Sequence, residues 1–357
     1  MRVGIPTEIK NNEYRVAITP AGVSELVRRG HDVVVQAGAG EGSAIHDDDF
    51  KAAGAQIIEG PDKVWAEADL LLKVKEPIEP EYSRMHKGQT LFTYLHLAAS
   101  RPCTDALLAS GTTSIAYETV QTADGALPLL APMSEVAGRL SAQVGAYHLM
   151  RTQGGRGVLM GGVPGVAPAK VVVIGGGMAG DNAAAVAWGM GAHVTVFDLN
   201  INILRKIDAE YGGAIETRYS SRLDLEDAVK QADLVIGAVL VPGAKAPKLV
   251  TNETVAQMKP GAVLVDIAID QGGCFEDSRP TTHDEPTFKV HDAVFYCVAN
   301  MPGAVPNTST WALTNATLSY AVKLADQGWK DAMRADPSLA KGLNTDAGQI
   351  TYAAVGD

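Results

Sequence analysis

The chain has 357 residues, and at ~150 residues per domain this length predicts two domains whose cores need no disulfide or metal support. Thirty basic and 41 acidic side chains give a formal charge of −11, which disfavours nucleic-acid phosphates and anionic membrane surfaces as partners. Hydrophobic residues make up 46% and charged residues 20% of the chain, a composition that excludes a mainly disordered protein.

The cysteines and the N-terminus indicate a soluble, cytoplasmic protein. Cys103, Cys274 and Cys297 are widely spaced and form no CxxC pair, so we expect neither a disulfide framework nor a zinc ribbon. The N-terminal stretch carries charges such as Glu8 where a signal peptide has an apolar run. Residues 157–180 are apolar but contain eight glycines and two prolines, so they predict two loops around one buried strand and not a membrane span.

Short apolar runs alternate with helix-like segments through the first third of the chain. We expect strands at 2–6, 32–36, 56–58, 69–75, 89–95 and 112–118. The helices between them begin and end with recognisable residues; for example, Thr19 and Pro20 are typical of a helix start, and Gly30 of its end. This alternation predicts right-handed βαβ units and a parallel sheet.

A second series follows a helix expected over 132–150 and a glycine-rich segment over 154–165. Its strands are expected at 171–174, 193–198, 217–220, 233–239, 262–268 and 293–299, with helices centred on 180–190, 201–210, 222–230 and 252–258. WAEADLLLKV (65–74) and VKQADLVIGAV (229–239) each place a helix end and Ala-Asp before a buried strand, which indicates two domains of related architecture. A long helix over 308–326 is expected to return to the first domain.

The segment KVVVIGGGMAGDNA (170–183) is typical of a dinucleotide-binding strand, turn and helix. Gly175 allows the tight turn, Gly177 lets the backbone approach a pyrophosphate, and Gly180 lets the helix pack on the strand. GxGxxG alone is weak in a chain with 37 glycines, but Asp198 ends the next strand about 20 residues later, where a ribose-binding acid is expected. A glycine-rich turn without a nucleotide is the alternative.

Asp198 also favours NAD over NADP. A carboxylate at this position accepts from the adenosine ribose hydroxyls and repels a 2′-phosphate, and no basic residue follows before Arg205. Asp181 lies in the first turn of the expected phosphate-binding helix, where it suits the helix dipole but lies near the pyrophosphate.

Polar side chains follow the ends of several expected strands, and ligands of open α/β sheets bind beyond those ends. In the first domain, Arg15 follows the first strand, Lys75 ends the fourth and His96 follows the fifth. In the second domain, the last two strands lead to Asp270 and Asn300.

These side chains suit a small α-keto or α-amino acid. Arg15 offers a planar fork to a carboxylate, and Lys75 can bind the same substrate and polarise its carbonyl. His96 is a suitable general acid or base, and Asp270 can orient water or ammonia. Each also has a plain structural interpretation: a solvated charge for Arg15 and Lys75, a core histidine, and a cap or turn residue for Asp270. Glu118, which ends the sixth expected strand, is interpreted as structural.

Other chemistries lack their signatures. The remaining histidines form no HxH or HxxxH pair, so no metal site is expected. The chain has no GxSxG elbow and no cysteine with an evident histidine partner. Hydride transfer to a nicotinamide fits best.

Seven segments are similar in order and spacing to bacterial alanine dehydrogenase, of the alanine dehydrogenase/transhydrogenase alpha-subunit family. They are MRVGIPTEIKNNEYRVAITPAGV, LLKVKEP, YLHLA, LLAPMSEVAGRLS, GVPGV, VVVIGGGMAG and LVDIAIDQGG. The resemblance extends from residue 1 to about residue 345. It implies an α/β fold of two doubly wound parallel-sheet domains: a discontinuous substrate domain (1–128 plus 306–357) and an inserted Rossmann domain that binds NAD (129–305).

The resemblance also implies an activity, namely the reversible oxidative deamination of L-alanine to pyruvate and ammonium with NAD, by a homohexamer. Arg15 and Lys75 would bind substrate, while His96 and Asp270 would transfer protons. Besides the fingerprint glycines, the expected cofactor contacts are Ser134, Met178, Ala179, Asp198, Ser220, Val239, Leu240, Ile267, Asn300 and Met301. Leu130 and Met133, close to the site in chain order, are expected to narrow the pocket to a methyl group.

Three other functions remain open from the sequence. The nucleotide-binding subunit of a proton-translocating transhydrogenase shares this ancestry, but LAPMSEVAGRL and Asp270 replace the residues expected there. A 2-hydroxy-acid dehydrogenase is disfavoured because its catalytic Arg and His normally lie in the cofactor domain. An NAD-binding regulator would make the set of Lys75, His96 and Asp270 a coincidence.

Overall fold

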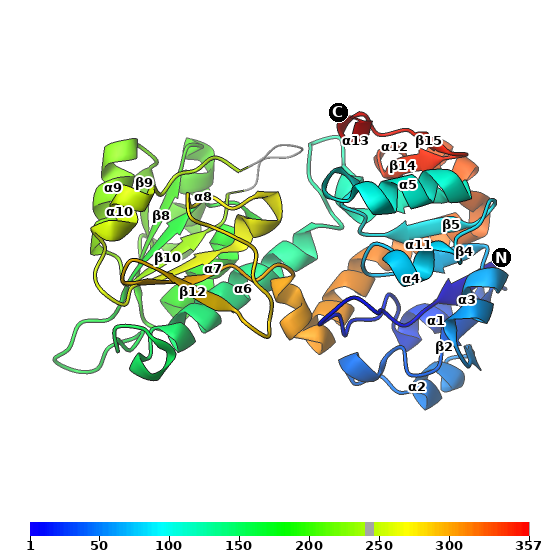
Figure 1. Ribbon diagram of the computed structural model, residues 1–357, viewed down its shortest axis with the longest axis horizontal. Helices are drawn as coiled ribbons and strands as arrows, with labels where there is room; N and C mark the ends of the chain where they lie inside the picture. The colour runs from blue at the N-terminus through cyan, green and yellow to red at the C-terminus, as the bar shows by residue number, and fades with distance from the viewer. Residues whose placement is uncertain (240–245, 357) are drawn as a thin grey trace. The chain divides into compact units, whose positions relative to one another are not determined.

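The computed structural model describes residues 1–239 and 246–356, which divide into two compact units. One unit is Met1–Met133 with Val305–Asp357, and the other is Ser134–Ala304. The first boundary lies within helix α6 (Ala131–His148), whereas the sequence placed the two boundaries after residues 128 and 305. Each unit is an α/β structure built on one sheet of mostly parallel strands (Figure 1).

The first unit is built on a sheet with the strand order β15-β14-β6-β5-β4-β1-β2-β3. The strands are β1 (Arg2–Ile5), β2 (Asp32–Gln36), β3 (Gln56–Ile58), β4 (Leu70–Leu72), β5 (Thr90–Thr93), β6 (Thr113–Ala116), β14 (Leu343–Asp346) and β15 (Gln349–Ile350). Strands β1 to β6 pair in parallel, and β14 and β15 extend the sheet in antiparallel pairing beyond β6.

Helices cover both faces of this sheet. They are α1 (Pro20–Arg28), α2 (Asp47–Ala52), α3 (Pro61–Glu67), α4 (Glu79–Tyr82), α5 (Arg101–Ser110), α11 (Pro306–Ala335), α12 (Pro337–Ala340) and α13 (Ala353–Gly356). Leu71 and Leu91 share a core cluster with Trp65 of α3 and residues of α5. Leu72, which points to the opposite face, lies beside α1 and α11.

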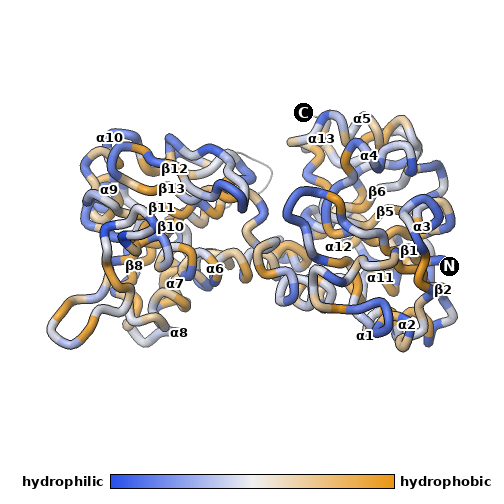
Figure 2. Tube along the Cα trace, turned by 60° about the horizontal axis from the view of Figure 1, so that its bottom comes forward, coloured by the Kyte–Doolittle hydropathy of each residue, from blue (hydrophilic) through white to orange (hydrophobic). Residues whose placement is uncertain are grey.

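The second unit has the strand order β12-β13-β11-β10-β7-β8-β9. The strands are β7 (Lys170–Ile174), β8 (His193–Asp198), β9 (Glu216–Tyr219), β10 (Leu234–Gly237), β11 (Val263–Asp266), β12 (Thr287–Val290) and β13 (Ala293–Tyr296). The helices besides α6 are α7 (Met178–Gly189), α8 (Ile201–Tyr211), α9 (Arg222–Gln231) and α10 (Asn252–Ala256). In Figure 2 the peripheral helices α9 and α10 carry much hydrophilic colour, while the strands supply buried apolar side chains.

The six main strands of each unit have the same spatial arrangement. If the six strands of each unit are numbered along the chain, their order across the sheet is 3-2-1-4-5-6. This order places β1 beside β4 in the first sheet and β7 beside β10 in the second. Ligands of such sheets bind beyond the carboxyl ends of the strands where the order reverses. The topology therefore directs attention to the loops that follow β1 and β4, and to those that follow β7 and β10.

The expected parallel strands are all present, although most are shorter than predicted. Strands β12, β14 and β15 were not predicted, and each pairs in antiparallel fashion at a sheet edge. The long C-terminal helix extends from Pro306 to Ala335 and is interrupted at Gly328, whose φ of 71° is non-helical, whereas the sequence predicted one helix over 308–326. Among the residues described, no helix has the length and apolar character that crossing a membrane requires.

Candidate functional site

A buried network of charges joins the loops that follow β1 and β4. The Lys73 ammonium donates to Glu8 and to Glu81, at 2.9 Å in each case, and all three side chains are 3% exposed or less. Glu8 also accepts from the backbone N–H of Val74 at 2.6 Å. This network holds the chain on both sides of the point where the sheet order reverses.

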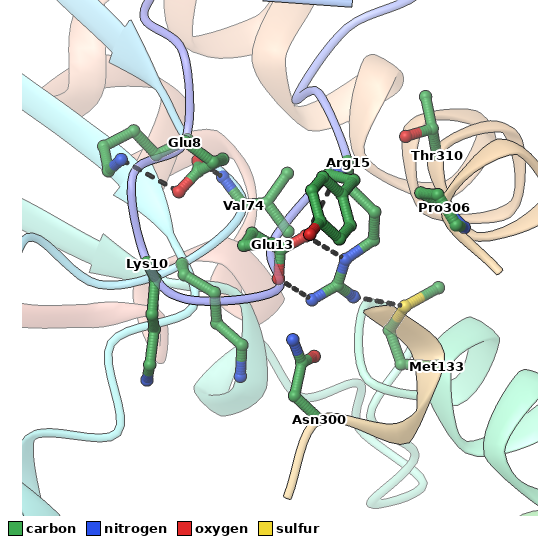
Figure 3. Close-up of polar contacts among 12 residues, drawn as sticks. Glu8, Lys10, Glu13, Arg15, Val74, Met133, Asn300, Pro306 and Thr310 are labelled. Atoms are coloured by element: carbon green, nitrogen blue, oxygen red, sulfur yellow. Dashed lines mark hydrogen bonds and ion pairs between the residues drawn. The ribbon is translucent and has the colours of Figure 1, made fainter. Parts of the chain in front are cut away.

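Arg15, in the loop after β1, is buried and tightly bound by Glu13. Its Nε and Nη2 donate to the two carboxylate oxygens of Glu13 at 2.6 and 2.5 Å, and its Nη1 donates to the sulfur of Met133 at 3.0 Å (Figure 3). Burial lowers the pKa of the guanidinium, but the carboxylate of Glu13 outweighs burial and raises it. Arg15 is therefore a fixed cation and not the solvated surface charge of the alternative interpretation.

Two hydroxyl groups hold the backbone on either side of Arg15. Ser43 Oγ donates to the carbonyl of Tyr14 at 2.9 Å, and Val16 N donates to Thr310 Oγ1 at 3.1 Å. The two hydroxyls hydrogen-bond each other at 2.8 Å. Thr310 belongs to the first turns of α11, so residues from the C-terminal part of the chain position this N-terminal loop.

Lys75 lies three residues beyond β4 and is 8% exposed. The hydroxyl of Thr93, at the end of β5, donates to the Lys75 carbonyl at 3.0 Å. Burial acts to raise the pKa of the adjacent Glu76, but the charges of Lys75, Lys10 and His96 outweigh it and lower that pKa. Lys75 and His96 therefore act on a common neighbour.

His96 follows β5 in a strained backbone conformation. Its φ of 48° lies in the left-handed region, which a residue with a side chain adopts only when its surroundings impose it. Glu118 imposes it by accepting the backbone N–H groups of Leu95 and His96 at 3.1 and 2.7 Å. The imidazole stacks on Tyr94, with ring centroids 5.9 Å apart and an interplanar angle of 11°, and its side chain stays 35% exposed.

Tyr94 connects the histidine with the arginine. Burial raises the pKa of its phenol, and the nearby charge of Arg15 partly offsets the rise. The hydroxyl donates to the carbonyl of Leu129 at 2.5 Å. The first unit thus brings Arg15, Lys75 and His96 to the carboxyl ends of neighbouring strands, and a cavity of ≈ 340 Å³ is lined by the Thr7–Arg15 loop and by Gly38, Ala39 and Gly42.

The glycine segment of the second unit begins where β7 ends. A Cβ on Gly180 would lie 1.7 Å from the carbonyl oxygen of Gly175, so the first turn of α7 can lie this close to the end of β7 only with glycine at position 180. A Cβ on Gly177 would meet nothing within 4 Å, which leaves open space in front of the first turn of α7. A tight turn, an open backbone and a helix N-terminus are the features that hold a pyrophosphate.

Asp198 lies at the end of β8 and faces this turn. Its carboxylate accepts from the backbone N–H of Gly176 and of Asn200, each at 2.7 Å. Asp181 is bound by Lys206 and by the hydroxyl of Tyr211, each at 3.0 Å. The Lys206 charge therefore balances the acid that lies in the first turn of α7.

The other predicted cofactor residues lie in several parts of the second unit. Ser134, Met178, Ala179, Ser220, Val239, Ile267 and Asn300 are partly or well exposed, and Met301 is buried. Asp270 is exposed in a 3₁₀ turn (Ile267–Gln271) after β11, which ends earlier than predicted. Asn300 has a left-handed φ of 68° in a turn four residues after β13. Leu240 lies outside the described residues.

Sequence reasoning missed Glu13, Glu8, Lys73 and Glu81. Glu8 and Lys73 are 65 residues apart, so no local spacing connects them. The one available signal was the number of acids in the loop after the first strand, where TEIKNNEYR places two glutamates within nine residues.

Comparison with known proteins relates both units to one family. Family models described as "Alanine dehydrogenase/PNT, N-terminal domain" and "Alanine dehydrogenase/PNT, C-terminal domain" match residues 4–137 and 141–353. The chain is 82% identical over 355 residues to the alanine dehydrogenase of Mycolicibacterium smegmatis, covering 99% of this chain and 96% of that protein.

Solved structures give the same relation. An L-alanine dehydrogenase matches with a TM-score of 0.96 and 52% identity, covering 99% of this chain and 98% of that one. A transhydrogenase from Sinorhizobium meliloti matches with a TM-score of 0.83 and 26% identity, covering 99% and 100%. The transhydrogenase is thus the more distant of these relatives.

Lys73→Met tests the buried charge network. The substitution leaves two buried carboxylates without their cation, and we expect a loss of about 3–5 kcal/mol in the free energy of unfolding near pH 8. Burial already raises the pKa of Glu8, and the Lys73 charge opposes that rise. Without Lys73 the folded state binds more protons than the unfolded state above pH 4.5, so the variant's stability falls as pH rises.

Urea denaturation of the variant at pH 5 and pH 8 measures this dependence. Lys51→Met, which removes an exposed ion pair with Asp48, is the control and is expected to change neither value. Equal destabilisation of the Lys73 variant at both pH values would contradict the assignment.

Proposed function

The chain belongs to the alanine dehydrogenase/PNT family, and from this membership we propose the reaction and the residues that carry it out. Membership confirms the resemblance found in seven sequence segments and the expected enzyme class, an amino-acid dehydrogenase. The reaction is the reversible deamination of L-alanine to pyruvate and ammonia. The observation that supports it most directly is the placing of Arg15, Lys75 and His96 at the strand ends of one sheet.

We propose NAD as the cofactor of the second unit. The open backbone at Gly177 leaves room for a pyrophosphate, and the Asp198 carboxylate lies beside the turn, where ribose hydroxyls can donate to it. NAD supplies the one chemistry that no side chain can perform, acceptance of the α-hydrogen of alanine as hydride.

The substrate's charged groups are assigned to Arg15 and Lys75. Arg15 is held as a planar cation by Glu13, which suits it to bind the α-carboxylate. Lys75, nearly buried, takes the same carboxylate or the carbonyl oxygen of pyruvate. The sulfur of Met133 lies on the Arg15 guanidinium, so Met133, with Leu130, limits the space for the substrate side chain. Such a pocket discriminates by about 1–3 kcal/mol per methylene.

Proton transfer is assigned to His96 and Asp270. The partly exposed imidazole of His96 takes a proton from the water that attacks the substrate's imine carbon, and returns one as ammonia leaves. Asp270, which is exposed after β11, is assigned the orientation of water or ammonia from family membership. The Glu118 hydrogen bonds hold the backbone of His96, so the ring stays in one orientation through both steps.

We also propose a cytoplasmic homohexamer. The free cysteines are all buried and unpaired, as in proteins of a reducing compartment. Leu159, Val163 and Val166 are 54–64% exposed in one loop of the second unit, and exposed apolar patches of this kind mark contact surfaces. Light scattering on the purified protein is expected to give six times the 37.4 kDa chain mass; a monomer would contradict the proposal.

The reaction is tested by mixing the protein with NAD and L-alanine and following nicotinamide reduction. We expect reduction with alanine, reversal with pyruvate plus ammonium, and no signal with lactate. His96→Ala is expected to lower turnover by at least about a hundredfold, because general acid–base catalysis contributes 10²–10⁴, while NADH still binds. Reduction with lactate alone would assign the protein to the hydroxy-acid class, and NADH binding without any turnover would indicate a regulator.

Asp198→Ser tests the cofactor assignment. Removing the carboxylate removes the repulsion of a 2′-phosphate and the hydrogen bonds to the ribose, so the ratio of kcat/KM for NAD to that for NADP is expected to fall about tenfold or more. Asp208→Ser, on the same unit in α8, serves as the control. An unchanged ratio in the Asp198 variant would remove this residue from cofactor recognition.

A further inference from the structure

The carboxylate of Glu13 makes more hydrogen bonds with Arg15 than the neutralisation of its charge requires. Glu13 Oε1 accepts both the backbone N–H of Arg15, at 3.1 Å, and its Nε, at 2.6 Å, while Oε2 accepts from Nη2. The side chains are 0% and 2% exposed. One carboxylate thus binds both the backbone N–H and the guanidinium of the same arginine.

These contacts remove the freedom that the backbone leaves to the side chain. Ser43 and Thr310 already hold the peptide groups on either side of Arg15. The remaining freedom is therefore rotation about the bonds of the Arg15 side chain. The bidentate contact sets the plane and the direction of the fork, because two parallel hydrogen bonds have one favourable geometry. The sulfur of Met133 accepts from the other terminal nitrogen, Nη1 (Figure 3).

We propose that Glu13 is a positioning residue for substrate recognition: it orients the Arg15 guanidinium so that this group binds the substrate carboxylate in the productive direction. The inference rests on the proposed function, in which Arg15 binds that carboxylate. Glu13 itself contacts no substrate in this role and acts through the arginine.

Two variants separate orientation from charge. Glu13→Asp keeps the negative charge but withdraws it by one methylene, so the fork loses its direction and keeps its counter-ion. Glu13→Gln keeps the length but presents an amide N–H group to an arginine N–H group, which can no longer be bridged. Because a displacement of about 1 Å can cost up to a hundredfold, we expect KM for alanine and for pyruvate to rise about tenfold or more in both variants, with a smaller change in kcat.

The experiment measures KM and kcat in both directions, with urea denaturation followed by circular dichroism to measure the folded fraction of each variant. Glu25→Gln, which loses a partly exposed glutamate bonded to Arg28 and Arg29, is the matched control and is expected to keep wild-type values. A structural role alone would lower the folded fraction, and with it kcat per chain, and would leave KM of the remaining enzyme unchanged.

Each outcome decides one question. Absence of alanine-dependent turnover in the wild-type protein would overturn the proposed function. Wild-type turnover with an unchanged KM in Glu13→Asp would overturn the positioning role alone. If Glu13→Gln fails to fold, the Asp variant still gives the answer, and a raised KM in a fully folded variant supports the inference.

Discussion

Lys73 is the charge on which the arrangement of the first unit depends. Its fully buried ammonium joins Glu8, in the loop after β1, to Glu81 of α4. The cost of removing such a triad from water is rarely recovered as stability, but the triad fixes positions that an apolar cluster would leave less defined. The two loops that it joins carry Arg15 and Lys75, so one buried cation contributes to the placement of both substrate-binding candidates.

The two units have the same strand order but present different chemical groups where that order reverses. After β7 the chain turns at once through glycines, and the backbone N–H groups of a helix N-terminus are exposed to an anion. After β1 a longer loop crosses the same point of its sheet, and its charged side chains bond to each other and to the residues that follow β4. In the proposed function, one topology therefore recognises an anion with backbone groups in one unit and with side chains in the other.

The sequence predicts those structural elements that leave a pattern in neighbouring residues. Buried parallel strands are continuous apolar runs, so they were predicted, whereas the largely polar strands β14 and β15 have no such pattern and depend on pairing beyond β6, with β15 at the edge of the sheet. The rule of strand ends found Arg15, Lys75 and His96. It could not find the bidentate contact of Glu13 with Arg15, which depends on the loop conformation. Nor could it find the left-handed backbone of His96, which depends on the distant Glu118.

The discontinuity of the first unit has a consequence for the order in which the protein matures on the ribosome. Residues 134–304 are continuous in the chain and can fold as soon as they emerge, but β6 lacks its neighbour β14 until the last residues are made. The hydroxyl of Thr310, which holds the backbone beside Arg15, also arrives late. We therefore expect the nascent chain to complete the second unit first, and the loop that carries Arg15, although translated within the first fifteen residues, to be among the last parts to reach its final form.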